Sequence, residues 1–449
     1  MEILEAIKFI NENILWGIPM LVLMFGTGIC MIAATRGALF LHLGFVIKNI
    51  KKLLLKKEDD DNAHSGITPF QAVSTALAGT LGTGNIIGVA LAISVGGPGS
   101  IFWMWLAAVF GIVIKYSEAA LAVEYRQIRN GCKVGGPMYY MKNGLNKKGM
   151  AVWFCIAAIV SSFGIGSSVQ SNSIAQSAKT AFGAEPEFTA VAVSALVALV
   201  LLGGIKRIAG MAQVLVPVMA GMYIAAAVIV LAANIAEIPR AFGIIVHDAF
   251  RGSAAVGGFA GATVIQACRM GLSRGVFTNE AGLGSSPIAH AAGDVKHPAQ
   301  QGMLGAFEVF ADTIVTCTLT ALVIIVTGEW KENTGATEVA AAFDSVLPFG
   351  TGGYIVMLGL ILFAFATIPA WYYYGEKCVE FLAGRRLIPY YKAAYIASVY
   401  AGAVISLDKV WILADFFNGM MAVPNLIALI MLMPKVGRIT GEFFGKYAK

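Results

Sequence analysis

The sequence predicts an all-α polytopic membrane protein with about eleven transmembrane helices. Hydrophobic residues make up 58% of the 449-residue chain, its mean hydropathy is +0.75, and only 13% of its residues are charged. A soluble domain carries about 25% charged residues. The apolar residues gather in runs of roughly 20, the length that a helix needs to cross a bilayer. Glycine and polar residues interrupt two of these runs, and broken helices of this kind form binding sites in transporters.

Eleven segments qualify as spanning helices, and two amphipathic stretches between them predict helices at the membrane interface. The spanning segments are approximately 13–35, 69–96, 99–129, 150–182, 188–205, 211–234, 257–278, 299–327, 352–383, 390–406 and 408–433. The amphipathic stretches are Ala38 to Lys57 and Pro239 to Phe250.

Lysine and arginine in the loops predict the orientation of the chain. With the N-terminus outside, the cytoplasmic loops hold nearly four times as many basic residues as the external loops. Basic residues near span ends favour the cytoplasm. We therefore expect a multi-pass protein of the plasma membrane whose N-terminus is external and whose C-terminus is cytoplasmic.

The second segment contains the stretch around which the chain is organised, Ser74 to Ala90. Gly79, Gly82 and Gly84 lie at its centre and are followed by Asn85. Each glycine weakens a helix by about 1 kcal/mol relative to alanine. Within a membrane, an interrupted backbone is tolerated where it is buried in protein or lines a cavity. The cluster thus predicts two half-helices with an ion and substrate site between them, and the alternative is that the glycines only permit close helix packing.

A weak internal symmetry divides the rest of the chain. Without the first helix ten spans remain, and the first and sixth of these, 69–96 and 257–278, are both rich in glycine and polar residues. Two groups of five spans have opposite topologies, and interrupted helices at matching positions are typical of transporters with inverted repeats. The predicted regions are an extra N-terminal helix (1–37), an amphipathic cytoplasmic segment (38–66), two five-helix repeats (67–236 and 237–434) and a cytoplasmic tail (435–449).

Four motifs resemble the alanine or glycine:cation symporter family over nearly the whole chain. They are TPFQA at 68–72, GTLGTGNIIGVA at 79–90, GGPMYY at 135–140 and GLSRGVFTNEAGLGSSPIAH at 271–290. The family is similar in architecture to the leucine-type sodium symporters. The resemblance implies uptake of alanine or glycine driven by sodium, or by protons in some members, and some members also accept D-alanine.

An amino acid substrate needs one partner for its carboxylate and one for its ammonium. Amides at a half-helix N-terminus suit the carboxylate, so we expect the backbone from Gly82 to Asn85 to bind it. The resemblance implies that the carbonyls of Ala78 and Leu81 bind one sodium ion, with Asn85 beside the substrate carboxylate. The predicted substrate residues of this segment are Gly79, Thr80, Gly82, Thr83, Gly84 and Asn85.

Two further spans are expected to face the broken helices. In 150–182, Gln170 is long enough to reach the substrate and Phe163 is a candidate for the pocket wall, although interhelical hydrogen bonding also explains the polar residues there. In 352–383, the resemblance implies that Thr367 and the Phe363 carbonyl bind sodium. The alternative for the threonine is a bond to its own preceding turn. Ile368 and Trp371 are expected to limit the pocket to small side chains.

The second interruption is predicted at Gly271, Ser273 and Gly275, which are assigned to substrate binding. Arg269 and Arg274 lie in the same segment. Because a cationic side chain at the centre of a spanning helix costs about 3 kcal/mol on insertion scales, each arginine needs a partner. The candidate partners are Glu280, Glu118 and Asp312.

Two pairs of charged residues lie within spans. Lys115 and Glu118 are three residues apart on one predicted helix and are expected to neutralise each other. Glu308 and Asp312 are four apart. They either brace neighbouring helices or form a proton or cation relay, and the second possibility leaves a proton-coupled symporter as the alternative function.

Other classes of function fit less well. The chain has no phosphate-binding loop of the Gly-x-x-x-x-Gly-Lys-Ser/Thr type. All five histidines lie at or outside the predicted span ends, which disfavours an intramembrane hydrolase. A channel can also be built from broken helices, but the sequence lacks short re-entrant repeats. We therefore expect a transporter rather than an enzyme, active as a monomer, with Na⁺ as coupling ion and without an organic cofactor or a nucleic acid partner.

Overall fold

Helices occupy most of the described part of each of the eleven apolar segments. The computed structural model describes residues 2–55, 66–129, 131–251, 264–331, 335–405 and 408–447. Part of the seventh segment, residues 257–263, lies outside the described residues. Both predicted amphipathic stretches are helical. They form α3 (Ala38–Leu41) with α4 (Leu43–Leu54), and α13 (Ile238–Arg251).

The remaining α-helices are α1 (Glu2–Ile10), α2 (Ile18–Thr35), α5 (Pro69–Thr80), α6 (Ile87–Gly96), α7 (Ser100–Glu124), α8 (Pro137–Tyr139), α9 (Lys148–Ser161), α10 (Val169–Phe182), α11 (Pro186–Leu201), α12 (Gly204–Ala233), α14 (Val264–Asn279), α15 (Pro287–His290), α16 (Pro298–Val309), α17 (Thr318–Thr327), α18 (Ala336–Asp344), α19 (Thr351–Ala383), α20 (Ile388–Val404), α21 (Asp408–Met431) and α22 (Met433–Tyr447). Wide π-helical turns include η1 (Asn11–Leu15), η5 (Ser162–Ser168) and η7 (Phe310–Cys317), and η3 (Thr83–Asn85) is a tight 3-10 turn. β1 (Gln127–Arg129) and β2 (Cys132–Val134) form an antiparallel hairpin.

Seven helical stretches, counted over the described residues, are long and apolar enough to cross a membrane. The chain is therefore a multi-pass membrane protein. Of the other predicted spans, α11 and α20 have 16 and 17 residues, the described part of α14 has 16, and α5 is separated from α6 by the interruption. Each of these is shorter than the roughly 20 residues that an untilted span needs.

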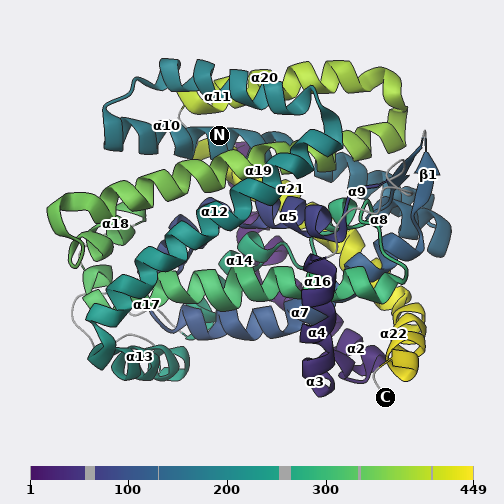
Figure 1. The fold of residues 1–449 in the computed structure, drawn as a ribbon, viewed down its shortest axis with the longest axis horizontal. Coiled ribbons are helices and arrows are strands. Elements are labelled where there is room, and N and C mark those ends of the chain that lie inside the picture. Colours follow the sequence, from purple (N-terminus) through teal and green to yellow (C-terminus); the bar gives the residue numbers. More distant parts are fainter. Residues whose placement is uncertain are drawn as a thin grey trace.

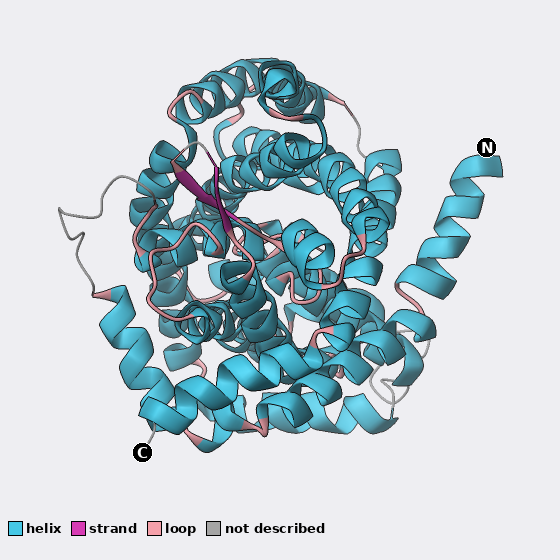
Figure 2. Cartoon of the chain, turned by 90° about the vertical axis from the view of Figure 1, so that its right-hand side faces the viewer, coloured by secondary structure: helices cyan, strands magenta, loops and turns pink. Residues whose placement is uncertain are grey.

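The long helices pack side by side, with α5 against α12 and α19 and α14 against α6 and α7. In Figure 1, α7 and α16 run along each other near one edge, and α10, α11 and α20 lie together at the opposite edge. α19 packs against α5, α9, α10 and α12, which places it between the two groups. Figure 2 shows the N-terminal and C-terminal ends at opposite margins of the molecule.

The first predicted interruption is present. α5 begins with a capping box in which Gln71 N–H donates to Thr68 Oγ1 (3.1 Å) and Thr68 N–H donates to Gln71 Oε1 (3.0 Å). Pro69 occupies the first helical position, where its missing N–H costs nothing. The helix ends at Thr80, because Leu81 turns to a ψ of 88°, and a helix resumes only at Ile87.

The predicted position of the second interruption is wrong. α14 continues through Gly271, Ser273 and Gly275 to Asn279. The glycines serve packing instead, since a Cβ on Gly271 would lie 2.1 Å from the Ser100 carbonyl oxygen of α7. The chain leaves the helix at Glu280, whose φ of 54° is left-handed, and runs without regular structure to α15.

Candidate functional site

The first interruption exposes backbone carbonyls in the buried centre of the bundle. In a continuous helix, Gly82 N–H would donate to the Ala78 carbonyl. Here it donates to Asn85 Oδ1 at 3.0 Å, and Asn85 N–H turns to the Gly82 carbonyl at 3.4 Å. The carbonyls of Ala78 and Leu81 therefore lose their usual partners in the helix. All of these residues are buried.

Thr367 of α19 lies against the end of α5. Its Oγ1 is 3.0 Å from the Ala78 carbonyl oxygen and 3.0 Å from the Phe363 carbonyl oxygen. Thr367 is only 1% exposed. A hydroxyl has one proton and can donate fully to only one of the two oxygens. Ala78, Phe363 and Thr367, three of the four predicted sodium ligands, thus meet at one point. The bond of Thr367 to its own preceding turn, which was the alternative, exists together with its contact to α5.

The glycines of the first interruption have different neighbours. A Cβ on Gly79 would lie 2.6 Å from the Tyr374 hydroxyl, and one on Gly84 would lie 2.7 Å from Thr278 Cγ2. These two glycines permit close helix packing, which was the alternative to a binding role. A Cβ on Gly82 would instead lie 3.0 Å from Thr367 Oγ1. Gly82 is therefore the glycine that keeps the surroundings of Thr367 open.

Three buried oxygen atoms beside the interruption have no hydrogen-bond partner among the described residues: Thr83 Oγ1, Gln170 Oε1 and the Tyr374 hydroxyl. Gln170 Nε2 donates to the Ile165 carbonyl at 3.1 Å, which fixes the amide. Its Oε1 would then be 3.8 Å from a Cβ on Gly82. Because a buried polar atom without a partner is costly, these oxygens suit a polar ligand.

The predicted wall residues Ile368, Trp371 and Phe163 lie in two different surroundings. Trp371 and Ile368 are fully buried in α19, and the Trp371 ring makes an edge contact with Tyr374 at 5.7 Å between centroids. Phe163 packs against the rings of Tyr391 and Tyr395 of α20, at 5.5 and 5.9 Å. Phe163 therefore belongs to an aromatic cluster with α20, and Tyr395 of that cluster donates to the Ile368 carbonyl at 2.8 Å.

Two predicted polar residues are already bonded within the protein. Asn85 Nδ2 donates to Asp312 Oδ1 at 2.6 Å, while its Oδ1 accepts from Gly82 N–H, so the side chain connects the interruption to η7. Thr80 Oγ1 lies 3.4 Å from the carbonyls of Ala76 and Leu77 in its own helix. Asn85 thus orients the Gly82 amide, and no atom of its amide group is left without a partner.

The second interruption is built by residues 279–285, none of which was among the predicted substrate residues. Glu280 is 2% exposed and accepts a short hydrogen bond from Ser285 Oγ, which closes the loop on itself. Asn279 Oδ1 accepts from Ala281 N–H at 2.9 Å, and Gly282 and Gly284 have left-handed φ values of 86° and 80°. The sequence feature that could have indicated this interruption is Glu280, a glutamate between two hydrophobic segments that is followed closely by Gly282 and Gly284.

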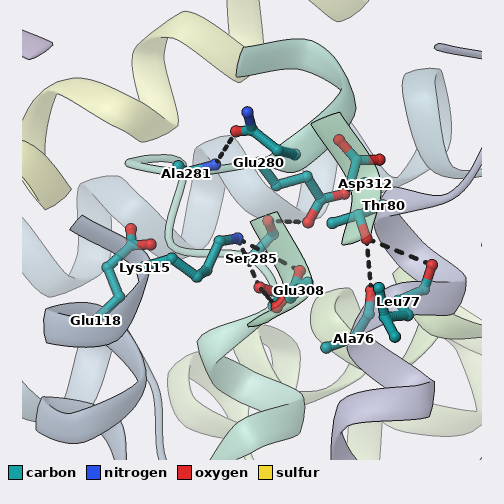
Figure 3. A network of polar contacts seen from close by, with 12 residues as sticks. Ala76, Leu77, Thr80, Lys115, Glu118, Glu280, Ala281, Ser285, Glu308 and Asp312 are labelled. Carbon is teal, nitrogen blue, oxygen red and sulfur yellow. Dashed lines mark hydrogen bonds and ion pairs between the residues drawn. The ribbon is translucent and has the colours of Figure 1, made fainter. Parts of the chain in front are cut away.

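A buried ion pair fixes this loop to α7 and α16. Figure 3 shows the Lys115 amine directed at Glu308, and the nitrogen lies 3.5 Å from Glu308 Oε1 and 2.7 Å from Ser286 Oγ. His290 Nε2 lies 2.8 Å from Glu308 Oε2, and Gln301 lies 2.7 Å from the other ring nitrogen. His290 is fully buried, and it lies in the short helix α15, outside the predicted spans.

We expect Lys115→Met to destabilise the protein by about 3–5 kcal/mol, because it leaves the Glu308 charge buried without its cation. Thermal unfolding of the detergent-solubilised protein measures this loss. Lys115→Met/Glu308→Gln removes both charges and should recover a large part of it. Equal loss in the single and double variants would show that Lys115 acts through packing alone.

Other charged side chains also have partners that differ from the predicted ones. Lys115 forms its ion pair with Glu308, and Glu118 accepts instead from Asn425 of α21. Asn425 also donates to the Gly282 carbonyl at 2.8 Å, so α21 contacts the second interruption. Arg274 interacts electrostatically with Asp415 of α21, a residue that was not among its candidate partners.

Comparison with known proteins identifies the family to which this chain belongs. The model of the sodium:alanine symporter family matches residues 1–449, the whole chain. The chain belongs to the sodium:alanine symporter family. It is 43% identical to the sodium/alanine symporter AgcS of Methanococcus maripaludis over 99% of this chain and 98% of that protein. It is 37% identical to the probable sodium/glutamine symporter GlnT of Bacillus subtilis, over 96% and 89% of the two chains.

Solved structures show the fold of this family member. MhsT in complex with L-phenylalanine matches with a TM-score of 0.57 and 13% identity over 84% of this chain and 98% of that chain. A Na⁺-coupled sialic acid symporter in an outward-open state matches with a TM-score of 0.52 and 14% identity over 92% and 86%. The symporter described here therefore has the leucine-transporter-type fold, as the resemblance implied.

Proposed function

We propose that this family member couples the inward movement of Na⁺ to the uptake of small neutral amino acids, namely alanine, glycine and D-alanine, by alternating access. The observation that carries the proposal is the meeting of the Thr367 hydroxyl with the Ala78 and Phe363 carbonyls at the end of α5. The family supports Na⁺-coupled amino acid symport.

The sodium site consists of oxygen atoms without a formal charge. Hard cations prefer oxygen ligands, and Ala78, Phe363, Thr367 and Leu81 supply three carbonyls and one hydroxyl. A bound Na⁺ would accept a lone pair from Thr367 Oγ1 and one from the Ala78 carbonyl oxygen. These two oxygens lie 3.0 Å apart, and the hydroxyl donates to the carbonyl. Because these ligands come from α5 and α19, sodium favours the arrangement in which the two helices are in contact.

The substrate site lies next to the same interruption. The amino acid carboxylate binds the backbone from Gly82 to Asn85, where Asn85 orients the amide of Gly82. Gln170 Oε1 is a hydrogen-bond acceptor without a partner among the described residues and suits the substrate ammonium. Trp371 and Ile368 restrict the side chain to the size of alanine or glycine. Gly271, Ser273 and Gly275 are not part of this proposal, because α14 is continuous there.

A proton-coupled symporter is the second candidate function, and Asp312 is the residue that favours it. Glu308 is engaged by Lys115 and His290. Asp312 is buried without a cationic partner among the described residues and contacts Asn85 at the first interruption. A proton on Asp312 would thus act directly on the substrate-binding backbone, whereas Glu308 has a bracing role.

The protein acts as a monomer in the plasma membrane, with its N-terminus external and its C-terminus cytoplasmic. The excess of basic residues in the loops assigned to the cytoplasm supports this orientation.

Uptake of labelled alanine into liposomes that contain the purified protein tests the function. An inward sodium gradient is compared with an equal potassium gradient, each with and without an inward proton gradient. Uptake that requires sodium supports the site at Thr367. Uptake driven by protons alone moves coupling to Asp312, and no uptake under any condition contradicts the transport of alanine.

A further inference from the structure

A groove lies where two membrane-spanning stretches end. The stretch that contains α2 ends at Thr35, and the one that contains α21 ends at Met431. α3 and α22 follow these ends closely, and Figure 1 shows α2, α3, α4 and α22 together at one margin of the molecule, beside the C-terminus. The groove between the α2–α3 connection and α22 has a volume of about 620 Å³. Because the ends of spanning helices lie at the membrane surface, the groove is at the depth of lipid headgroups.

The groove is open and partly apolar. Leu41 lines it and is 76% exposed. Gly441 and Gly445 supply part of the wall on α22, and a Cβ added to either would meet no described atom within 4 Å. Gly437 differs, because a Cβ there would lie 2.9 Å from the Ala34 carbonyl oxygen. The start of α22 therefore packs closely against α2, while the turns from Gly441 onward leave room for a hydrocarbon chain.

Basic side chains gather at this groove. Arg36 and His42 line it. The Arg36 side chain is exposed and forms no hydrogen bond or ion pair with another described residue. Residues 36–55 and 433–447 together contain seven lysines and arginines and a single acidic residue, Glu442. A guanidinium offers planar N–H donors that match a phosphate group, so an anionic headgroup complements the charge of this groove.

The α4 helix extends this basic surface. Phe45 of α4 contacts Phe444, a residue of the groove, at 5.6 Å between ring centroids. α4 packs against α16 and α5 on one side, whereas Leu43 and Ile47 are each more than half exposed. Three exposed lysines accompany them, Lys48, Lys51 and Lys52. Residues 56–61, two lysines and four acidic residues, lie outside the described part of the chain. An amphipathic helix with exposed apolar residues and lysines favours the surface of an anionic membrane.

We propose that this groove binds one anionic phospholipid of the surrounding bilayer. The lipid phosphate contacts Arg36, and one acyl chain lies beside Leu41 and along Gly441 and Gly445. Basic pockets beside membrane helices bind anionic headgroups, and the lysines of α4 raise the local concentration of such lipids. A zwitterionic phospholipid carries its own cation and gains less from these residues. The site goes beyond the proposed symport and depends neither on the substrate nor on the coupling ion.

Native mass spectrometry of the full-length protein in detergent tests the headgroup contact. With dioleoyl-phosphatidylglycerol added, the wild type should bind this lipid about fivefold more tightly than dioleoyl-phosphatidylcholine, and Arg36→Gln should lower the phosphatidylglycerol affinity about fivefold. Arg386→Gln is the matched control, because Arg386 of η10 (Arg385–Leu387) is also exposed and without a partner among the described residues. Equal affinity of the wild type for the two lipids, or equal losses in the two variants, would overturn the proposal.

A second pair of variants tests the acyl chain. Gly441→Leu/Gly445→Leu fills the groove without a clash at Cβ, and leucine favours a helix over glycine, so the protein should remain folded. Phosphatidylglycerol affinity should fall at least about tenfold, because each CH₂ group kept out of the groove costs a factor of about four.

Gly210→Leu/Gly221→Leu is the control for this pair, because both glycines lie in α12 and a Cβ on either also meets no described atom within 4 Å. It should leave the affinity unchanged, and thermal unfolding checks that both double variants are folded. Unchanged phosphatidylglycerol affinity in a folded Gly441→Leu/Gly445→Leu would overturn the groove as the site. Displacement of the lipid by millimolar inorganic phosphate would reduce the site to one for simple anions and would also overturn the proposal.

Discussion

Replacement of Thr367 by alanine should raise the sodium concentration for half-maximal alanine uptake by about 10-fold to 150-fold. The variant loses one oxygen from the cluster with the Ala78 and Phe363 carbonyls. A hydrogen bond or ligand contact to a charged group contributes about 1.5–3 kcal/mol, and each 1.4 kcal/mol corresponds to a factor of about ten. The affinity for alanine at saturating sodium should change far less, since the substrate contacts remain.

Sodium titrations of uptake in liposomes, at fixed and saturating alanine, measure this effect. Thr327→Ala is a matched control. Among the described residues, Thr327 Oγ1 bonds only to carbonyls of its own helix, Val323 at 2.9 Å and Ile324 at 3.2 Å. Thr367→Ser keeps the hydroxyl and should retain most of the sodium affinity. An unchanged sodium dependence in Thr367→Ala would remove this residue from the set of ligands.

Replacement of Gly82 by valine should abolish binding of alanine at the central site while the protein remains folded. A Cβ at this position would already lie 3.0 Å from Thr367 Oγ1 and 3.8 Å from Gln170 Oε1, and valine adds two methyl groups. The φ of Gly82 is −133°, which an L-residue adopts without strain, so the effect comes from filled space. Gly82→Ala should give an intermediate loss of affinity.

Equilibrium binding of labelled alanine and size-exclusion chromatography test this expectation together. Gly88→Ala is the control for Gly82→Ala, since a Cβ on Gly88 has one neighbour, Thr278 Cγ2, at 4.0 Å. High-affinity binding in a monodisperse Gly82→Val would place the substrate elsewhere. Aggregation of Gly82→Val together with normal binding by Gly82→Ala would assign Gly82 to packing.

The sequence predicted the first interruption well because its cause is local. Three glycines within six residues lower the helix propensity wherever they lie, and the Thr68 capping box starts the helix from adjacent residues. The same sequence did not predict which of these glycines lies beside Thr367 and which permit close helix packing. Gly79 approaches α19, Gly84 approaches α14, and Gly82 faces Thr367. These neighbours lie nearly 200 residues or more further along the chain, so local sequence does not reveal them.

The second interruption shows where local reasoning fails. Gly271 and Gly275 also lower helix propensity, yet α14 continues through both. Their close packing against Ser100 and Met104 of α7 stabilises the helix more than the two glycines weaken it. The helix ends instead at Glu280, a residue that rarely adopts a left-handed conformation. Its bond to Ser285, and that of the following Ser286 to Lys115, stabilise the loop in this unusual path.

By itself the sequence determined the membrane class, the approximate positions of the apolar helices, the first interruption and the family, because hydropathy, glycine clusters and caps act between neighbouring residues. Only the tertiary structure decided the partners of the buried charges: Lys115 with Glu308, Asn85 with Asp312, and Arg274 near Asp415. A charge within a membrane needs a partner wherever it lies, but the helix that supplies the partner is set by packing. The spacing of residues along one helix does not contain that information.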